Sequence, residues 1–227
     1  MAEQKNNRSK SVSSKQKKGK NASFFAAVTV LVLLIVVPVV FLLISTFLNR
    51  GASNQLNETL YPMGYSSIVS EAAREYDVDE CLIYGVIRTE SNFNSEAVSP
   101  VGAVGLMQIM PETFTWLQNY RTDFQPEEIL DSEKLFDPAV NIDYGVFMLS
   151  YLLSRYDGNE SLAVCAYNAG HGNVDSWIDE GIISVDNVAA EDIPFTETSN
   201  YLNRVMSAKE MYNMLYFAES REDYTSE

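Results

Sequence analysis

The chain has 227 residues, of which 46% are hydrophobic and 21% are charged, and its formal net charge is −15 at pH 7. The charge is segregated: residues 1–21 carry seven Lys and Arg side chains and one acid, whereas residues 51–227 carry 8 basic and 30 acidic side chains. A region this acidic is not expected to bind nucleic acid, because phosphates are neutralised by basic side chains. One histidine and two cysteines exclude a multi-histidine metal site, a cysteine-rich zinc site and a disulfide scaffold.

A long apolar stretch follows the basic N-terminus. Residues 22–48 contain no charged side chain, and a helix of roughly 20 apolar residues crosses a bilayer. We therefore expect one N-terminal transmembrane helix over 22–48; a cleaved signal peptide is the alternative. The basic tail of residues 1–21 is poor in aromatic and aliphatic residues, so we expect it to be disordered. Its bases predict that it lies in the cytoplasm, which places the rest of the chain outside the cytoplasm, on the cell-wall side. Residues 49–62 are polar and form the expected linker.

After the linker, apolar residues recur at helical spacing and no stretch alternates as a strand would. Helix starts are indicated by Asp79, an N-cap residue, and by Pro111 and Pro138, since proline favours the first helical turn. Gly170 and Gly172 are expected to end a helix. The predicted helices cover residues 68–76, 80–90, 111–120, 138–156, 160–168 and 197–217.

These helices predict a mostly α domain over residues 63–217, followed by an acidic tail at 218–227. Its two cysteines, Cys81 and Cys165, fall in apolar helical segments. A disulfide can form outside the cytoplasm, but we expect two buried thiols.

Glu90 is the strongest candidate for chemistry on residue pattern alone. It continues the apolar stripe of Ile83, Val86 and Ile87 and lies at the end of its helix. Burial and the negative end of the helix dipole both disfavour the carboxylate, so both raise its pKa toward that of a general acid at neutral pH. The alternatives are an ion pair with Arg88 or a side chain turned out to solvent.

Two further segments are candidates for ligand contact. Residues 99–105 are rich in small residues and turns, which allow close backbone approach, although an ordinary loop explains them equally well. Tyr167 and Asn168 end a helix just before glycines, where they could bind sugar hydroxyl or N-acetyl groups or simply cap the helix. Methionines such as Met107 are more often core residues than ligand contacts.

Four segments, taken in order, resemble a known family. They are ESNFNSEAVSPVGAVGLMQIMPET, FDPAVNIDYGVFMLSYLL, SLAVCAYNAGHGNV and IPFTETSNYLNRV. Each is weak alone, but their order is similar to that of the motifs in soluble-lytic-transglycosylase (SLT) domains, over residues 63–217. The resemblance implies a lysozyme-like helical domain with a substrate groove.

The resemblance also implies an activity: cleavage of the β-1,4 bond between N-acetylmuramic acid and N-acetylglucosamine in peptidoglycan, without a cofactor or metal. Glu90 matches the family's single catalytic acid/base. The positions that match substrate-binding residues are Ser99, Gln108, Met110, Tyr167, Asn168, Glu197 and Tyr201. Two positions depart from the usual pattern, Leu202 in place of valine and His171 in place of proline, and we expect His171 to be a loop residue rather than a base.

The implied reaction is a transfer within the substrate that forms 1,6-anhydromuramyl ends and consumes no water. One alternative is a goose-type lysozyme hydrolase, which needs a second carboxylate such as Asp143 to activate water. Another is an inactive wall-binding scaffold. The expected partners are peptidoglycan glycan strands, the membrane through the anchor, and an envelope-spanning or wall-synthesis machinery.

Overall fold

The computed structural model describes residues 36–42, 59–121 and 129–218. The chain divides into two units, Met1–Thr59 and Leu60–Glu227. Of the predicted transmembrane segment, residues 36–42 are described, and they are helical; the predicted tail at 1–21 and most of the acidic tail lie outside the described residues. No helix within the described ranges is both long and apolar enough to span a bilayer.

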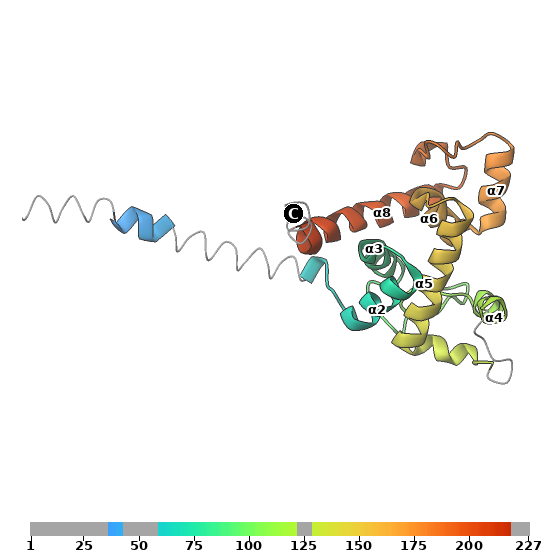
Figure 1. The fold of residues 1–227 in the computed structure, drawn as a ribbon, viewed down its shortest axis with the longest axis horizontal. Helices are drawn as coiled ribbons and strands as arrows, with labels where there is room; N and C mark the ends of the chain where they lie inside the picture. The colour runs from blue at the N-terminus through green and yellow to red at the C-terminus, as the bar shows by residue number, and fades with distance from the viewer. Residues whose placement is uncertain (1–35, 43–58, 122–128, 219–227) are drawn as a thin grey trace, which may run out of the picture. The chain divides into compact units, whose positions relative to one another are not determined.

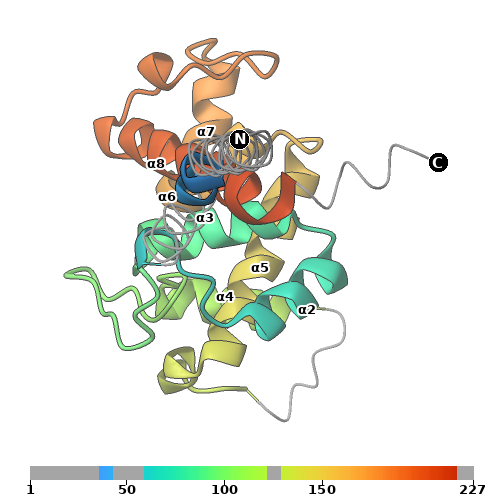
Figure 2. The same cartoon turned by 90° about the vertical axis from the view of Figure 1, so that its left-hand side faces the viewer.

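The second unit is built from helices and short helical turns (Figures 1 and 2). In chain order they are α2 (Ser66–Tyr76), α3 (Glu80–Glu90), α4 (Pro111–Tyr120), η1 (Ser132–Phe136), α5 (Pro138–Arg155), α6 (Glu160–Ala169), α7 (His171–Asp179), η2 (Ala190–Asp192), α8 (Thr196–Tyr212) and η3 (Asn213–Phe217). Two isolated β-bridges, Val98 to Val104 and Val104 to Ile109, are the extended pairings recorded among the described residues. The prediction of a mostly α domain is confirmed.

Capping residues explain where the predicted helices begin. The Asp79 carboxylate accepts a hydrogen bond from the Cys81 backbone N–H at 2.8 Å, and the Asp137 carboxylate accepts one from Ala139 at 2.9 Å. Prolines occupy the first turn of α4 and of α5, as expected. The capping residues and prolines therefore predict the starts of these helices correctly.

The segment after α6 differs from the prediction. Gly170 ends α6 with φ +82°, but it is also the residue before α7, so the chain turns and begins a new helix at once. Gly172 lies inside α7, and His171 is its first residue rather than part of a loop. Both expectations were wrong, because one glycine with a positive φ both ends one helix and permits the turn into the next.

The core forms around α3, which packs most extensively against α8 (Figure 1). Every residue from Cys81 to Ile87 is buried. A Cβ at Gly85 would lie 2.9 Å from the Val205 carbonyl oxygen on α8, so the close approach of the two helices requires glycine there.

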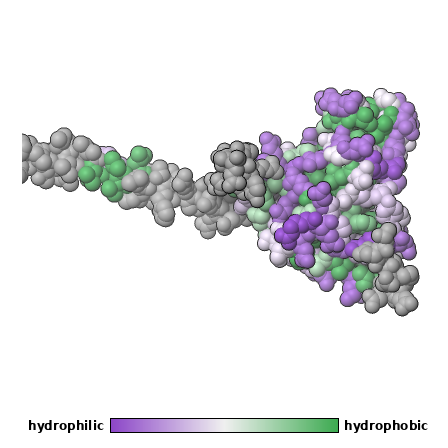
Figure 3. Space-filling model, viewed as in Figure 1, coloured by the Kyte–Doolittle hydropathy of each residue, from purple (hydrophilic) through white to green (hydrophobic). Residues whose placement is uncertain are grey.

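Cys81 and Cys165 are both buried as thiols, as expected. Hydrophilic side chains cover much of the face drawn in Figure 3.

Candidate active site

Glu90 is the last residue of α3 and its side chain is only partly exposed. The Tyr201 hydroxyl, from α8, donates a hydrogen bond to its Oε1 at 2.7 Å. Tyr201 itself is 2% exposed, so the contact lies within the packing of α8 against the end of α3. The helix packing thus brings together two residues that are 111 positions apart in the chain.

The surroundings of Glu90 favour its protonated form. Burial raises the pKa of Glu90 to about 7, against an ordinary value of 4.5. The Tyr201 hydrogen bond and the charge of Arg204 lower this pKa, and the charge of Glu197 raises it, but burial dominates. A carboxylic acid with a pKa near 7 can hold a proton at neutral pH and release it to a substrate.

The alternative pairing with Arg88 is wrong. The guanidinium of Arg88 lies over the ring of Tyr61, with its Cζ 4.3 Å from the ring centroid, and its Nε donates to the Leu60 carbonyl at 3.1 Å. Arg88 therefore fastens the start of the domain to α3 and does not neutralise Glu90.

Tyr167 and Asn168, at the end of α6, border Glu90 and α8. The charge of Glu90 contributes to the raised pKa of Tyr167, after the larger effect of burial. The Tyr167 hydroxyl donates to the Met107 carbonyl at 2.9 Å, and Asn168 Oδ1 accepts a hydrogen bond from the Thr198 hydroxyl at 2.7 Å. These bonds join α6 to the loop before α4 and to the first turn of α8.

Ser99 and Gln108 build the loop of residues 97–109. The Ser99 hydroxyl accepts from the Ala103 N–H at 2.9 Å, and the Gln108 amide donates to the Ala97 and Gly105 carbonyls at 3.2 and 2.9 Å. Their hydrogen bonds in the described part of the chain stay within this loop. Their substrate contacts remain predictions.

The loop is held against the domain by buried polar groups. Asn141, which is 0% exposed, donates to the Val104 carbonyl at 2.9 Å and accepts from the Met107 N–H at 2.7 Å. Gly105 has a φ of +80°, and a side chain there would collide with Asn141. The hydroxyl of Ser91, the C-cap residue of α3, donates to the Leu106 carbonyl at 2.8 Å. This bond places the loop next to the end of α3.

The remaining predicted residues lie at helix starts. Met110 is the N-cap residue of α4 and is partly exposed. Glu197 is exposed in the first turn of α8 and acts on Glu90 through its charge. Tyr167, Glu197 and Tyr201 therefore all lie close enough to Glu90 to interact with it electrostatically. We call these four residues the Glu90 neighbourhood.

Three contributors to this neighbourhood were not predicted. The Met107 carbonyl holds Tyr167, the Thr198 hydroxyl holds Asn168, and the Arg204 charge acts on Glu90. Arg204 follows Glu197 and Tyr201 by seven and three residues, which puts all three on one face of α8. Helical spacing could have identified Arg204, whereas a backbone carbonyl leaves no signal in a sequence.

Asp143, the candidate second carboxylate, is engaged elsewhere. Its two oxygens accept hydrogen bonds from the Tyr76 hydroxyl at 2.5 Å and from Arg121 Nη1 at 2.6 Å. These contacts fasten α5 to α2 and to the end of α4. Among the described residues, Glu197 is the carboxylate whose charge acts on Glu90.

Comparisons with known proteins identify relatives of this domain. Residues 67–182 match the transglycosylase SLT domain. The chain is 34% identical over 156 residues to the soluble lytic murein transglycosylase of Salmonella typhimurium, which covers 68% of this chain and 24% of the relative. It is also 34% identical over 169 residues to membrane-bound lytic murein transglycosylase C of Mannheimia succiniciproducens, covering 65% of this chain and 46% of the relative.

Solved structures show the same fold. An inactive mutant of the lytic transglycosylase Slt from Pseudomonas aeruginosa superposes with a TM-score of 0.63 at 33% identity, covering 70% of this chain and 25% of that one. The 70 kDa soluble lytic transglycosylase in complex with bulgecin A gives a TM-score of 0.64 at 30% identity, with 70% and 26% coverage. The chain spans about a quarter of the length of the soluble relatives. By its fold, its four ordered motifs and the match over residues 67–182, this chain belongs to the transglycosylase SLT domain family.

Proposed function

We propose that the chain is a lytic transglycosylase that cleaves the β-1,4 bond between N-acetylmuramic acid and N-acetylglucosamine in peptidoglycan. The observation that carries this proposal is the position of Glu90: a half-buried carboxyl group with a pKa of about 7, hydrogen-bonded to Tyr201. Relatives named lytic murein transglycosylases support the substrate class. Ser99, Gln108, Met110, Tyr167, Asn168, Glu197 and Tyr201 are the proposed substrate-binding residues.

In the proposed reaction Glu90 acts twice. Its proton passes to the glycosidic oxygen as the bond from that oxygen to C1 of the muramic acid breaks, and the substrate's own N-acetyl group stabilises C1. The Glu90 carboxylate then takes the proton of the C6 hydroxyl, whose oxygen closes onto C1. The product is a 1,6-anhydromuramyl end, Glu90 is protonated again and no water is consumed.

The assignment of one catalytic acid, Glu90, favours this reaction over hydrolysis. A hydrolase of this kind uses a second carboxylate, at roughly 5–9.5 Å from the acid depending on its stereochemistry. The contacts of Asp143 with Tyr76 and Arg121 support a reaction in which Asp143 does not activate water. Glu197 is the remaining acid near Glu90, and we assign it to the substrate rather than to water.

We also propose that residues 22–48 anchor the enzyme in the membrane as a single pass. The uncharged run and the basic residues before it support this topology, as does the existence of a membrane-bound relative. The catalytic domain would then work outside the cytoplasm on glycan near the membrane, beside an envelope-spanning or wall-synthesis machinery.

The mass of the reaction product tests the proposal. Purified full-length protein should release fragments from peptidoglycan sacculi that are lighter by one water than the reducing-end fragments of a hydrolase. Fragments with reducing ends would establish a hydrolase instead. If no fragments are released, the alternative of an inactive wall-binding scaffold is favoured. Bulgecin A, which binds a relative, should bind this chain too and suppress the release.

A further inference from the structure

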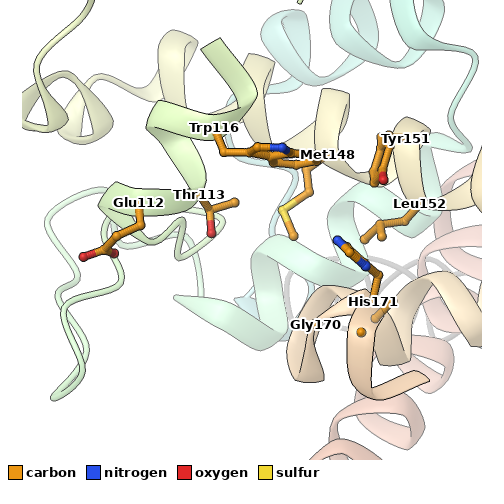
Figure 4. Close-up of a pocket in the computed structure, with 10 residues that line it drawn as sticks. Glu112, Thr113, Trp116, Met148, Tyr151, Leu152, Gly170 and His171 are labelled. Atoms are coloured by element: carbon orange, nitrogen blue, oxygen red, sulfur yellow. The ribbon is translucent and has the colours of Figure 1, made fainter. Parts of the chain in front are cut away.

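A pocket of about 400 Å³ lies between α4, α5 and the turn from α6 to α7, apart from the contacts of Glu90. Trp116 from α4 and Met148, Tyr151 and Leu152 from α5 line it, and His171 closes it from α7 (Figure 4). Its volume falls in the range of about 300–1,000 Å³ that small-ligand sites occupy. Nothing in the proposed reaction uses it.

The walls are mainly apolar and aromatic. Trp116 is 38% exposed, and its ring meets that of Tyr151 edge-on at 5.2 Å, while the His171 ring lies 6.3 Å from Tyr151. In Figure 4 the side chains of Trp116, Met148 and His171 border one space, whereas the Glu112 carboxylate points away from it. An open indole face beside the hydroxyl groups of Thr113 and Tyr151 suits a ligand with a C–H face and hydroxyl groups, which is the chemistry of a sugar ring.

The pocket is lined by residues from two elements that also carry candidate substrate-binding residues. Trp116 follows Met110 by six residues on α4, which puts it ~9 Å farther along at 1.5 Å per residue. Gly170, another lining residue, follows Tyr167 and Asn168 by two and three residues. A strand bound along both elements would therefore reach the pocket with a sugar other than those at the cleaved bond.

The negative charge of the domain favours the uncharged sugars of peptidoglycan over its anionic peptide stems as the ligand of this pocket. Glu112 is among the pocket residues, and residues 51–227 as a whole carry 30 acidic and 8 basic side chains. The Arg155 guanidinium is bound to Asp175 at 2.5 Å, so it is not directed to a ligand. Anionic peptide stems would be repelled here, whereas an uncharged sugar would not.

We propose that this pocket is a distal subsite that holds an N-acetylated sugar ring of the glycan strand stacked on Trp116. The proposal rests on the proposed function, because it assumes that a glycan strand lies across Glu90. It gives the enzyme a preference for strands long enough to reach from Glu90 to Trp116.

Binding to an inactive full-length variant tests the subsite. In a Glu90→Gln background, β-1,4-linked N-acetylglucosamine oligomers of increasing length should bind more tightly once they reach Trp116, as measured by calorimetry. Trp116→Ala should weaken the long oligomers roughly tenfold, as loss of ~1.4 kcal/mol of stacking would, and leave the short ones unchanged. Trp116→Phe should retain most of the affinity. The second tryptophan, Trp177, is buried, so a fluorescence change on binding would report on Trp116.

Tyr120→Ala is the matched control, because Tyr120 is 51% exposed and its ring lies 5.4 Å from Trp116, yet it does not line the pocket. Equal weakening by Tyr120→Ala and Trp116→Ala, or no length dependence in the parent protein, would overturn the subsite. An effect of Trp116 seen only with strands that carry peptide stems would overturn the sugar assignment. These readouts need no turnover, so they are separate from the product mass that tests the proposed function.

Discussion

The two ends of α3 place carboxyl groups against the same neighbour, α8, with opposite electrostatic results. At the start, Asp79 accepts the Cys81 N–H and lies 3.2 Å from Lys209 Nζ; burial opposes its ionisation, but these two partners outweigh burial and lower its pKa. At the other end, Glu90 receives the neutral Tyr201 hydroxyl, and burial raises its pKa to about 7.

The difference lies in which residues of α8 face each end. Lys209 brings a cation to Asp79 and to Glu160, whose Oε1 it approaches at 2.6 Å, whereas Arg204 is exposed and acts on Glu90 only through its charge. One end of the helix pair therefore stabilises the fold with charges. The other keeps a carboxyl group protonated, which costs stability and provides an acid.

The largest expected effect is on activity. Glu90→Gln removes the proton donor while keeping the size of the side chain, so turnover on sacculi should fall by ~10²–10⁴-fold or more. Asp79→Ala, at the opposite end, should leave turnover per folded molecule near the parent value. Comparable turnover in the two variants would contradict the assignment of Glu90.

Stability should change in opposite directions at the two ends. The pKa of Glu90 is raised in the folded state, so the stability that protonated Glu90 contributes is fully present below pH 4.5. That stability is lost as the pH rises through about 7. Glu90→Gln should therefore increase the free energy of unfolding at about pH 8, by up to ~3 kcal/mol, and change it little at about pH 4.

Asp79→Ala provides the contrast. The pKa of Asp79 is lowered in the folded state, so its charge stabilises the fold above its ordinary pKa of 3.8, and this part is lost as the pH falls through the lowered value. Losing the cap and the Lys209 pair should cost about 1–3 kcal/mol near neutral pH and less in acid. Denaturant unfolding at both pH values measures both variants; shifts of the same sign would contradict the comparison.

Removing the hydroxyl of Tyr201 should shift the titration of Glu90. The Tyr201 hydrogen bond lowers the pKa of Glu90, so Tyr201→Phe should raise it and move the alkaline limb of kcat/KM to higher pH. Tyr212→Phe, which removes a buried hydroxyl bound to the Pro62 carbonyl, is the matched control and should leave that limb in place. A limb that moves to lower pH would contradict the account.

The smallest effect is expected from Arg204. Its charge also lowers the pKa of Glu90, so Arg204→Gln should move the alkaline limb of kcat/KM to slightly higher pH. Salt should reduce the difference, because screening weakens exposed charges most. Arg155→Gln, on α5, serves as the control for loss of one positive charge. An equal shift of the limb in that variant would contradict a specific effect of Arg204 on Glu90.

The sequence predicted those parts of the site that depend on local signals. Asp79 and Pro111 marked helix starts correctly, and helix phase put Glu90 on a buried stripe. The second glycine after α6 was misinterpreted as a stop, because glycine spacing alone does not distinguish a turn between helices from a loop. The π-helical turn at Asn213–Phe217 had no signal that we recognised.

Contacts between distant segments were not available from residue pattern. Nothing in the local sequence of α3 indicates that Tyr201 meets Glu90, and its assignment rested on the family resemblance. The Arg88 alternative was plausible on spacing, but the ring of Tyr61 holds that side chain instead. Tertiary packing decides which neighbour a charged group finds, and helical periodicity does not contain that information.

Direct titration of the Glu90 carboxyl group tests the central claim. Carboxyl carbon NMR of the folded protein, with Glu90→Gln to assign the resonance, should give a midpoint at about pH 7. A midpoint near the ordinary value of 4.5 would mean that Glu90 is ionised at neutral pH and cannot serve as the acid proposed for this chain.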